Sequence, residues 1–114
     1  MPRSRTPQKP ALDRLEEMHA HAAEAAQLLK TLGSEQRLLI LCNLLEGELA
    51  VGELNERVDL SQSALSQHLA VLREAGLVTT RREAQSIFYS LPHGPVTQVM
   101  ALLQQIYCKP RSAR

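Results

Sequence analysis

The sequence predicts a mostly helical fold that carries one small β-hairpin. Apolar residues recur at helical spacing along most of the chain, and they are mainly Leu, Val and Ala, because aromatic residues make up only 3% of it. Two segments, 77–82 and 86–91, are instead rich in β-branched and aromatic residues, which favour strands. Only three residues separate these segments, so we expect them to pair as a hairpin.

The length of 114 residues predicts one domain, small enough that association of two copies would help to bury its core. We place this domain at residues 11–109 and a short tail at 110–114. Residues 1–10, MPRSRTPQKP, hold three prolines and three basic residues, and nothing that could be buried. This segment is predicted to be a disordered basic arm, and we favour a solvated terminus over a binding role for it.

The first two predicted helices meet at a glycine. Apolar residues keep helical spacing over 11–32, and many of them are alanines, which let another helix approach closely. Gly33 is expected to end this helix, and Ser34 to cap the next one. The run 38–45 is apolar nearly all round, which is typical of a buried central helix.

A short helix is expected over 51–58, with Leu54 facing inward. The last helix is expected over 95–108, because Pro95 suits a first helical turn and an apolar face follows it. The first and last helices are thus both strongly apolar and flank a small central unit. We therefore expect a homodimer that forms through these two helices.

The helix over 61–76 has a polar face of an unusual kind. Ser61 is a good N-cap, Gly76 suits the position just past a helix end, and Leu65, Leu69 and Leu72 form an apolar stripe. The opposite face carries short hydroxyl and amide groups in place of the usual Lys and Glu: Ser61, Gln62, Ser63, Ser66 and Gln67. Such groups form hydrogen bonds to base edges and phosphates in a DNA major groove. Taken alone, an ordinary amphipathic helix explains the pattern equally well.

A capped helix followed directly by a basic hairpin is the order of a winged helix-turn-helix, and here a family resemblance becomes specific. The sequence resembles the ArsR/SmtB family of bacterial repressors over most of residues 28–91. The matching motifs are Leu32-Gly33-Ser34-Glu35-Gln36-Arg37-Leu38, Ser66-x-His68-Leu69-x-x-Leu72, Gly76-Leu77-Val78, Arg82 and Tyr89-x-Leu91. The chain departs from the family at the hairpin tip, where Ala84 stands in place of a frequent Gly.

The resemblance implies a dimeric repressor that binds an inverted-repeat operator in double-stranded DNA. Two-fold symmetry would set the two recognition helices about 34 Å apart, one turn of the duplex. The hairpin would then be the wing, along which Arg81, Arg82 and Gln85 are expected to reach the DNA. Because the net charge is only +1, affinity for DNA has to come from the local placement of charge.

Two cysteines, Cys42 and Cys108, are the candidate sensing residues. In a reducing compartment a structural disulfide is not expected, so the pair is either inert or redox-active. Helical spacing places Cys42 in the core and Cys108 toward the polar side of the last helix. Their positions resemble those in the persulfide-sensing, BigR/SqrR-like branch of the family. That likeness implies a dithiol that binds DNA and a di-, tri- or tetrasulfide bridge that does not.

Other regulatory mechanisms and other classes of protein compete with this hypothesis. Metal-sensing members carry Cys-x-Cys or Asp/His sets in two stretches that correspond to 48–53 and 93–107, which hold no cysteine and only His93. We expect no metal site and no cofactor. A metal-responsive repressor, a repressor without a sensor and an anti-silencer remain alternatives. An enzyme is not expected, because the chain has neither Cys-x-x-Cys nor a Ser-His-Asp arrangement. No apolar run is long enough to span a bilayer, which predicts a cytoplasmic protein.

Overall fold

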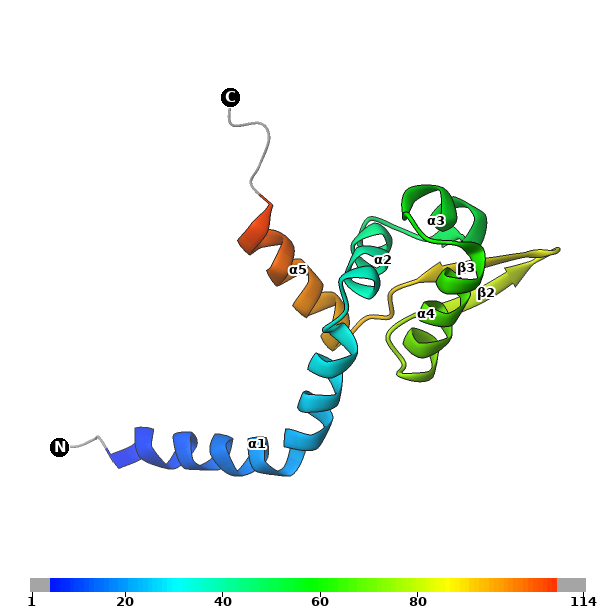
Figure 1. Ribbon diagram of the computed structural model, residues 1–114. Helices are drawn as coiled ribbons and strands as arrows, with labels where there is room; N and C mark the ends of the chain where they lie inside the picture. Colours follow the sequence, from blue (N-terminus) through cyan, green and yellow to red (C-terminus); the bar gives the residue numbers. More distant parts are fainter. Residues whose placement is uncertain (1–4, 109–114) are drawn as a thin grey trace. The chain divides into compact units, whose positions relative to one another are not determined.

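The computed structural model describes residues 5–108 of the chain, with side chains from residue 12 onward. It is mostly helical with one small antiparallel sheet, as predicted (Figure 1). The elements in chain order are α1 (Arg5–Leu32), α2 (Glu35–Leu45), β1 (Leu49–Ala50), α3 (Val51–Arg57), α4 (Gln62–Glu74), β2 (Thr79–Glu83), β3 (Ser86–Ser90) and α5 (Pro95–Tyr107). The chain divides after Lys30 into two units, which are described separately.

The first unit consists of most of α1, and this helix begins earlier than the sequence predicts. Residues 5–10, predicted as part of a disordered arm, are helical here. Pro7 falls in the first turn, where a backbone N–H has no acceptor within the helix, so this proline does not prevent the helix from starting. Residues 1–4 of the predicted arm and the predicted tail at 110–114 lie outside the described residues. None of the described side chains from 12 to 30 is buried.

The second unit holds the hydrophobic core, which is built from aliphatic side chains of the helices. The most deeply buried are Ile40, Leu41, Leu54, Leu65, Leu72, Val96 and Met100. Ser34 caps α2 as predicted, because its hydroxyl accepts the backbone N–H of Arg37 at 3.3 Å. The predicted burial of this helix on all sides is wrong at Leu39, whose side chain is 50% exposed. The inward position predicted for Leu54 is confirmed.

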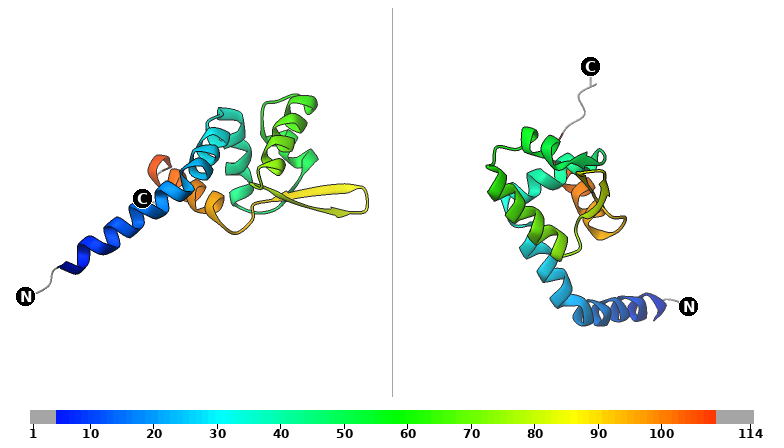
Figure 2. Two further views of the ribbon diagram at one scale, coloured as in Figure 1. Left: turned by 90° about the horizontal axis from the view of Figure 1, so that it is seen from below. Right: turned by 90° about the vertical axis from the view of Figure 1, so that its right-hand side faces the viewer.

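The sheet has three strands in the order β1-β3-β2, one more than the predicted hairpin. The additional strand, β1, pairs Leu49 with Tyr89 and Ala50 with Phe88. Strands β2 and β3 form the predicted hairpin and extend beyond the helices as a ribbon (Figure 2). Residues 84 and 85 make its turn, in which Ala84 has a φ of 57°, the left-handed region that favours Gly.

Candidate nucleic-acid interface and thiol pair

Helix α4 begins and ends where its sequence predicts. The hydroxyl of Ser61 accepts the backbone N–H of Ala64 at 3.1 Å, which satisfies one of the free amides of the first turn. At the other end Gly76 adopts a φ of 77°, and the N–H of Leu77 bonds to the carbonyl of Leu72 at 2.9 Å. This is the Schellman pattern, in which a glycine turns the chain out of the helix. Both ends of the helix are thus fixed by local chemistry.

The two faces of α4 divide as the periodicity predicts. Leu65, Leu69 and Leu72 are at most 2% exposed and anchor the helix on the core. Every residue predicted to contact bases from this helix is exposed: Ser61, Gln62, Ser63, Ser66 and Gln67. Apart from the Ser61 cap and a 3.4 Å contact between the hydroxyls of Ser61 and Ser63, these side chains have no hydrogen-bond partner among the described residues. The face therefore offers unsatisfied donors and acceptors to an external partner.

Open grooves flank α4 on both sides. One, of about 550 Å³, lies between α4 and the sheet and is lined by residues that include Ser66, Arg73 and Tyr89. The other, of about 350 Å³, lies between α3 and α4 and is lined by residues that include Asn55 and Gln62. The exposed polar face of α4 is thus a ridge between two hollows. A helix presented in this way has room on both sides for the walls of a DNA major groove.

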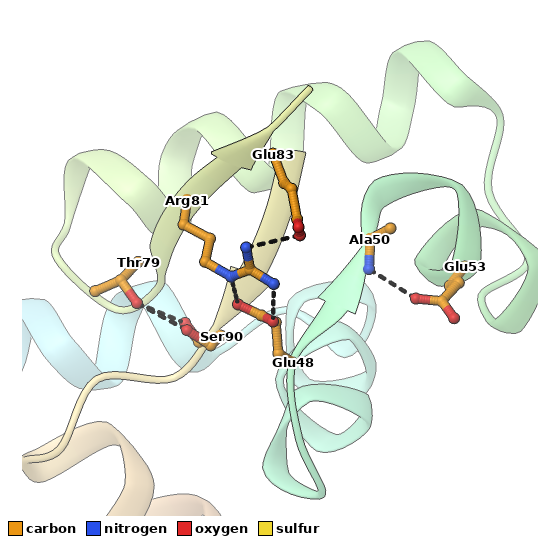
Figure 3. Close-up of polar contacts among 7 residues, drawn as sticks. All are labelled: Glu48, Ala50, Glu53, Thr79, Arg81, Glu83 and Ser90. Carbon is orange, nitrogen blue, oxygen red and sulfur yellow. Dashed lines mark hydrogen bonds and ion pairs between the residues drawn. The ribbon is translucent and has the colours of Figure 1, made fainter. Parts of the chain in front are cut away.

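The turn between α3 and α4 is closed by polar contacts of the chain itself. The amide of Asn55 donates to the carbonyl of Leu60 at 3.0 Å, and Val58 is buried beneath the turn. At the start of α3 the carboxylate of Glu53 accepts the backbone N–H of Ala50 at 2.8 Å (Figure 3). The Asn55 bond thus ties α3 to the turn that leads into α4, and the Glu53 bond caps the start of α3.

The wing places its two neighbouring arginines in different surroundings. Arg81 binds the carboxylate of Glu48 in a bidentate manner, through Nε at 2.8 Å and Nη2 at 2.9 Å, and Nη1 donates to Glu83 at 3.0 Å (Figure 3). Its guanidinium carbon lies 4.6 Å from the centroid of the Phe88 ring. Arg82 is exposed and has no such partner among the described residues. Both arginines were predicted to reach DNA. In the structure Arg81 is bound to two carboxylates of the protein, whereas Arg82 is not.

The two thiols belong to neighbouring helices. Cys42 lies near the end of α2 and is half-buried, whereas Cys108 is the exposed residue that caps α5. Helices α2 and α5 pack against each other. Burial raises the pKa of the Cys42 thiol, and the negative charge of a Cys108 thiolate raises that pKa further. The fold thus places the two predicted sensing residues on adjacent helices.

Comparison with known proteins decides the family. A model described as "Bacterial regulatory protein, arsR family" matches residues 34–80, from the cap of α2 into β2. The transcriptional activator HlyU of Vibrio cholerae is 55% identical over 95 residues, which covers 83% of this chain and 88% of HlyU. The chain belongs to the ArsR family.

Other ArsR-family relatives extend the likeness to the whole fold. The biofilm growth-associated repressor of Xylella fastidiosa is 46% identical over 82% of this chain and 82% of its own length. A solved structure described as reduced HlyU from Vibrio cholerae matches with a TM-score of 0.78 at 54% identity, covering 82% of this chain and 99% of that one. The repressor BigR from Xylella fastidiosa matches with a TM-score of 0.76 at 45% identity, covering 83% and 97%. The predicted winged helix-turn-helix fold is confirmed, and the chain is a DNA-binding transcriptional regulator.

Sequence reasoning missed both carboxylates that bind Arg81 in this ArsR-type site. Glu48 lies 33 residues before Arg81 and shows no local pattern that would link the two. The other carboxylate partner, Glu83, stands two residues after Arg81, a spacing that places both on one side of an extended strand. This two-residue spacing is the only sequence signal for the cluster around Arg81, and it identifies Glu83 but not Glu48.

No group of three or more His, Cys, Asp or Glu side chains among residues 12–108 is arranged to hold a metal ion. No helix in the same part of the chain is long and apolar enough to cross a membrane.

Proposed function

We propose that this ArsR-family protein is a homodimeric repressor that releases its operator when Cys42 and Cys108 react with persulfide. The proposal depends most on one observation: the two free thiols, Cys42 and Cys108, belong to helices α2 and α5, which pack against each other. The related protein HlyU has been solved in a form specified as reduced, which supports the redox state as a relevant variable in that relative.

The proposed DNA contacts divide between bases and phosphates. Glutamine amides pair with the edge of adenine, and serine hydroxyls accept or donate to several bases, so the exposed face of α4 is suited to reading sequence. On the wing, Arg82 and Gln85 are exposed and are proposed to contact the DNA backbone. Arg81, also predicted as a DNA contact, is already bound to carboxylates, and its role is treated separately below.

Dimerisation is supported by apolar side chains that the single chain leaves in solvent. Helix α5 exposes Leu102, Ile106 and Tyr107 at 53%, 56% and 78%, although Val96 and Met100 on the same helix are buried. Helix α1 exposes Leu12, Leu15 and Met18 at 54–58%. Apolar surface of this extent favours an association that covers it. A two-fold pair would present two copies of α4 to an inverted repeat.

Leu102→Glu is expected to convert the dimer into a monomer, because a carboxylate would have to be buried without a partner in the interface. Sedimentation velocity at micromolar concentration measures the change. Gln104→Glu is the matched control, since it adds the same charge to an exposed position on the opposite side of α5, and it should remain dimeric. A dimeric Leu102→Glu protein would show that this face of α5 is not in the interface.

The proposed sensing reaction begins at the accessible thiol. The Cys108 thiolate attacks the outer sulfur of a low-molecular-weight persulfide, forms a protein persulfide and releases a thiol. Cys42 then attacks the Sγ atom of Cys108 itself, which closes a disulfide and expels the outer sulfur as hydrogen sulfide. One dithiol and one persulfide thus give one disulfide, one thiol and one hydrogen sulfide. With two persulfides, Cys108 first passes its outer sulfur to Cys42 and is then loaded again, and the bridge retains one extra sulfur while one hydrogen sulfide leaves.

The bridge would act on DNA binding through α2. It ties the end of α5 to a helix that also packs against α3 and α4, the two helices of the helix-turn-helix. A change in the position or mobility of α2 would therefore reach the recognition helix directly. To release an operator, the bridge has to favour the non-binding state by a few kcal/mol.

The deciding experiment uses a duplex that the reduced protein has selected from random-sequence DNA. Its dissociation constant is measured by fluorescence anisotropy before and after treatment with glutathione persulfide, and the intact mass is recorded on the same samples. We expect weaker binding together with the loss of a pair of hydrogens or the gain of bridge sulfur, both reversed by dithiothreitol. Unchanged affinity of a fully bridged protein would refute the sensor, and release by zinc in place of persulfide would favour a metal-responsive regulator.

A further inference from the structure

Arg81 and Arg82 lie on opposite sides of the wing. Side chains alternate between the two sides of a strand, so adjacent residues point in opposite directions. In the sheet register Arg81 lies opposite Phe88, and Phe88 in turn lies opposite Ala50. Glu83 stands two residues from Arg81, and Glu48 stands two residues from Ala50, so both carboxylates lie on this same side. All the partners of Arg81 thus occupy one side of the sheet.

The other side of the sheet faces the recognition helix. Leu49 is buried there, and Tyr89, its partner in the register, lines the groove between the sheet and α4. Alternation places Arg82 and its partner Ile87 on this side, farther along the ribbon. Arg82 is therefore on the side of the wing where DNA held by α4 would pass, and Arg81 is on the opposite side.

The Arg81 side chain joins the two outer strands across the middle one. It starts on β2 and ends on Glu48, the residue that precedes β1 (Figure 3). Between these points its guanidinium lies over the Phe88 ring of β3. Strand β1 leads without interruption into α3, the first helix of the helix-turn-helix. The contact thus connects the wing to the element that orients α4. Within the sheet, backbone pairing over the two residues of β1 makes the same connection.

The positive charge of Arg81 is already compensated without DNA. Two carboxylates, Glu48 and Glu83, surround one guanidinium, so the group carries a net negative charge that repels phosphate. The hydrogen bonds from Arg81 lower the pKa of the Glu48 carboxyl, which keeps it ionised throughout the neutral range. A phosphate would have to displace a bidentate carboxylate to reach this arginine.

We propose that Arg81 is a positioning residue that fixes the wing on the helix-turn-helix through Glu48, while Arg82 is the wing arginine that contacts the DNA backbone. The inference depends on the proposed use of the wing in DNA binding, and not on the sensor. It reverses the simple expectation that both arginines of a basic wing act on DNA in the same way. Removing the carboxylate would free a cation, yet weaken binding.

Five variants test the assignment on the reduced protein with the selected duplex: Glu48→Gln, Arg81→Gln, Arg81→Lys, Arg82→Gln, and Glu48→Gln combined with Arg81→Gln. Dissociation constants are measured over a series of salt concentrations, because the slope of log K against log[salt] counts the phosphates that the protein neutralises. The variants change exposed side chains, and circular dichroism verifies that each is folded.

We expect Glu48→Gln and Arg81→Gln each to weaken binding about fivefold with an unchanged salt slope, since they act through the position of the wing. The double variant should be no weaker than either single one, because both remove the same contact. Arg82→Gln should reduce the slope by about 0.9 for each subunit. Arg81→Lys should fail to restore affinity, because an ammonium cannot bind the carboxylate in the same bidentate manner.

Three results would overturn the assignment: tighter binding by Glu48→Gln, a smaller salt slope for Arg81→Gln, or affinities of both variants equal to that of the wild type. The first two would mean that Arg81 contacts phosphate once it is released. A failure of the DNA interface itself would look different. In that case Arg82→Gln would leave the slope unchanged, whatever the Arg81 variants do.

Discussion

Gln67→Ala is expected to weaken binding to the selected duplex more than tenfold, while binding to a scrambled duplex changes little. Gln67 projects from the exposed face of α4 and has no hydrogen-bond partner among the described residues. A glutamine amide that pairs with an adenine edge contributes about 1–3 kcal/mol of discrimination at each half-site. In a dimer the loss occurs twice, which is why a single substitution has so large an effect.

The comparison of the two duplexes separates base reading from backbone binding. Fluorescence anisotropy gives both dissociation constants, and their ratio is the quantity of interest. Gln98→Ala serves as the matched control, because it removes an exposed glutamine from α5 instead of α4. If Gln67→Ala lowered both affinities equally, Gln67 would contact the DNA backbone and would not be one of the α4 residues that read bases.

Cys108→Ser is expected to abolish the reaction with persulfide, whereas Cys42→Ser is expected to stop it after the first step, the formation of a persulfide on Cys108. Without Cys108 the accessible nucleophile is missing, so no sulfur is taken up and the duplex stays bound. Without Cys42 a persulfide forms on Cys108 but cannot close into a bridge, and the duplex again stays bound. Intact mass distinguishes the two, because only the Cys42→Ser protein should carry an added sulfur.

The raised pKa of Cys42 gives this reaction a defined pH dependence. At neutral pH the Cys42 thiol is protonated, and only its thiolate attacks. Since the pKa lies above its ordinary value, the thiolate fraction and the rate of closure should rise about tenfold for each pH unit from neutral into the alkaline range. Rapid acid quenching followed by mass spectrometry measures this rate. A closure rate independent of pH, or release of DNA by either Ser variant, would contradict the proposed order of events.

Helix α4 was predictable from sequence because its determinants are local. Ser61 and Gly76 mark its ends through bonds that span only a few residues, and Leu65, Leu69 and Leu72 mark its buried side by their spacing alone. The same applies to the hairpin, whose two strands are neighbours in the chain. The exposed polar face of α4 follows as the complement of the buried one.

The features that escaped prediction depend on residues far apart in the chain. Strand β1 has two residues, too few for any alternation, and exists only because Leu49 and Ala50 pair with β3. The contact between Arg81 and Glu48 requires that strand to be in place. Leu39 was expected in the core and is half exposed. The sequence pattern shows that a side chain is apolar, but it does not show whether another part of the protein covers that side chain. The early start of α1 shows that prolines near a helix start are a weak sign of disorder.

Side chains alternate between the two sides of the wing, so its function depends on whether a deletion removes an odd or an even number of residues. Deleting Thr80, which lies between Thr79 and Arg81, would leave the composition and the net charge of the wing almost unchanged. It would, however, carry each following side chain of the strand to the reverse surface of the ribbon. Arg82, which now meets solvent near the duplex, would then lie on the side of Glu48, and Arg81 would take the open position. Deletions of a single residue should therefore be more harmful here than deletions of two.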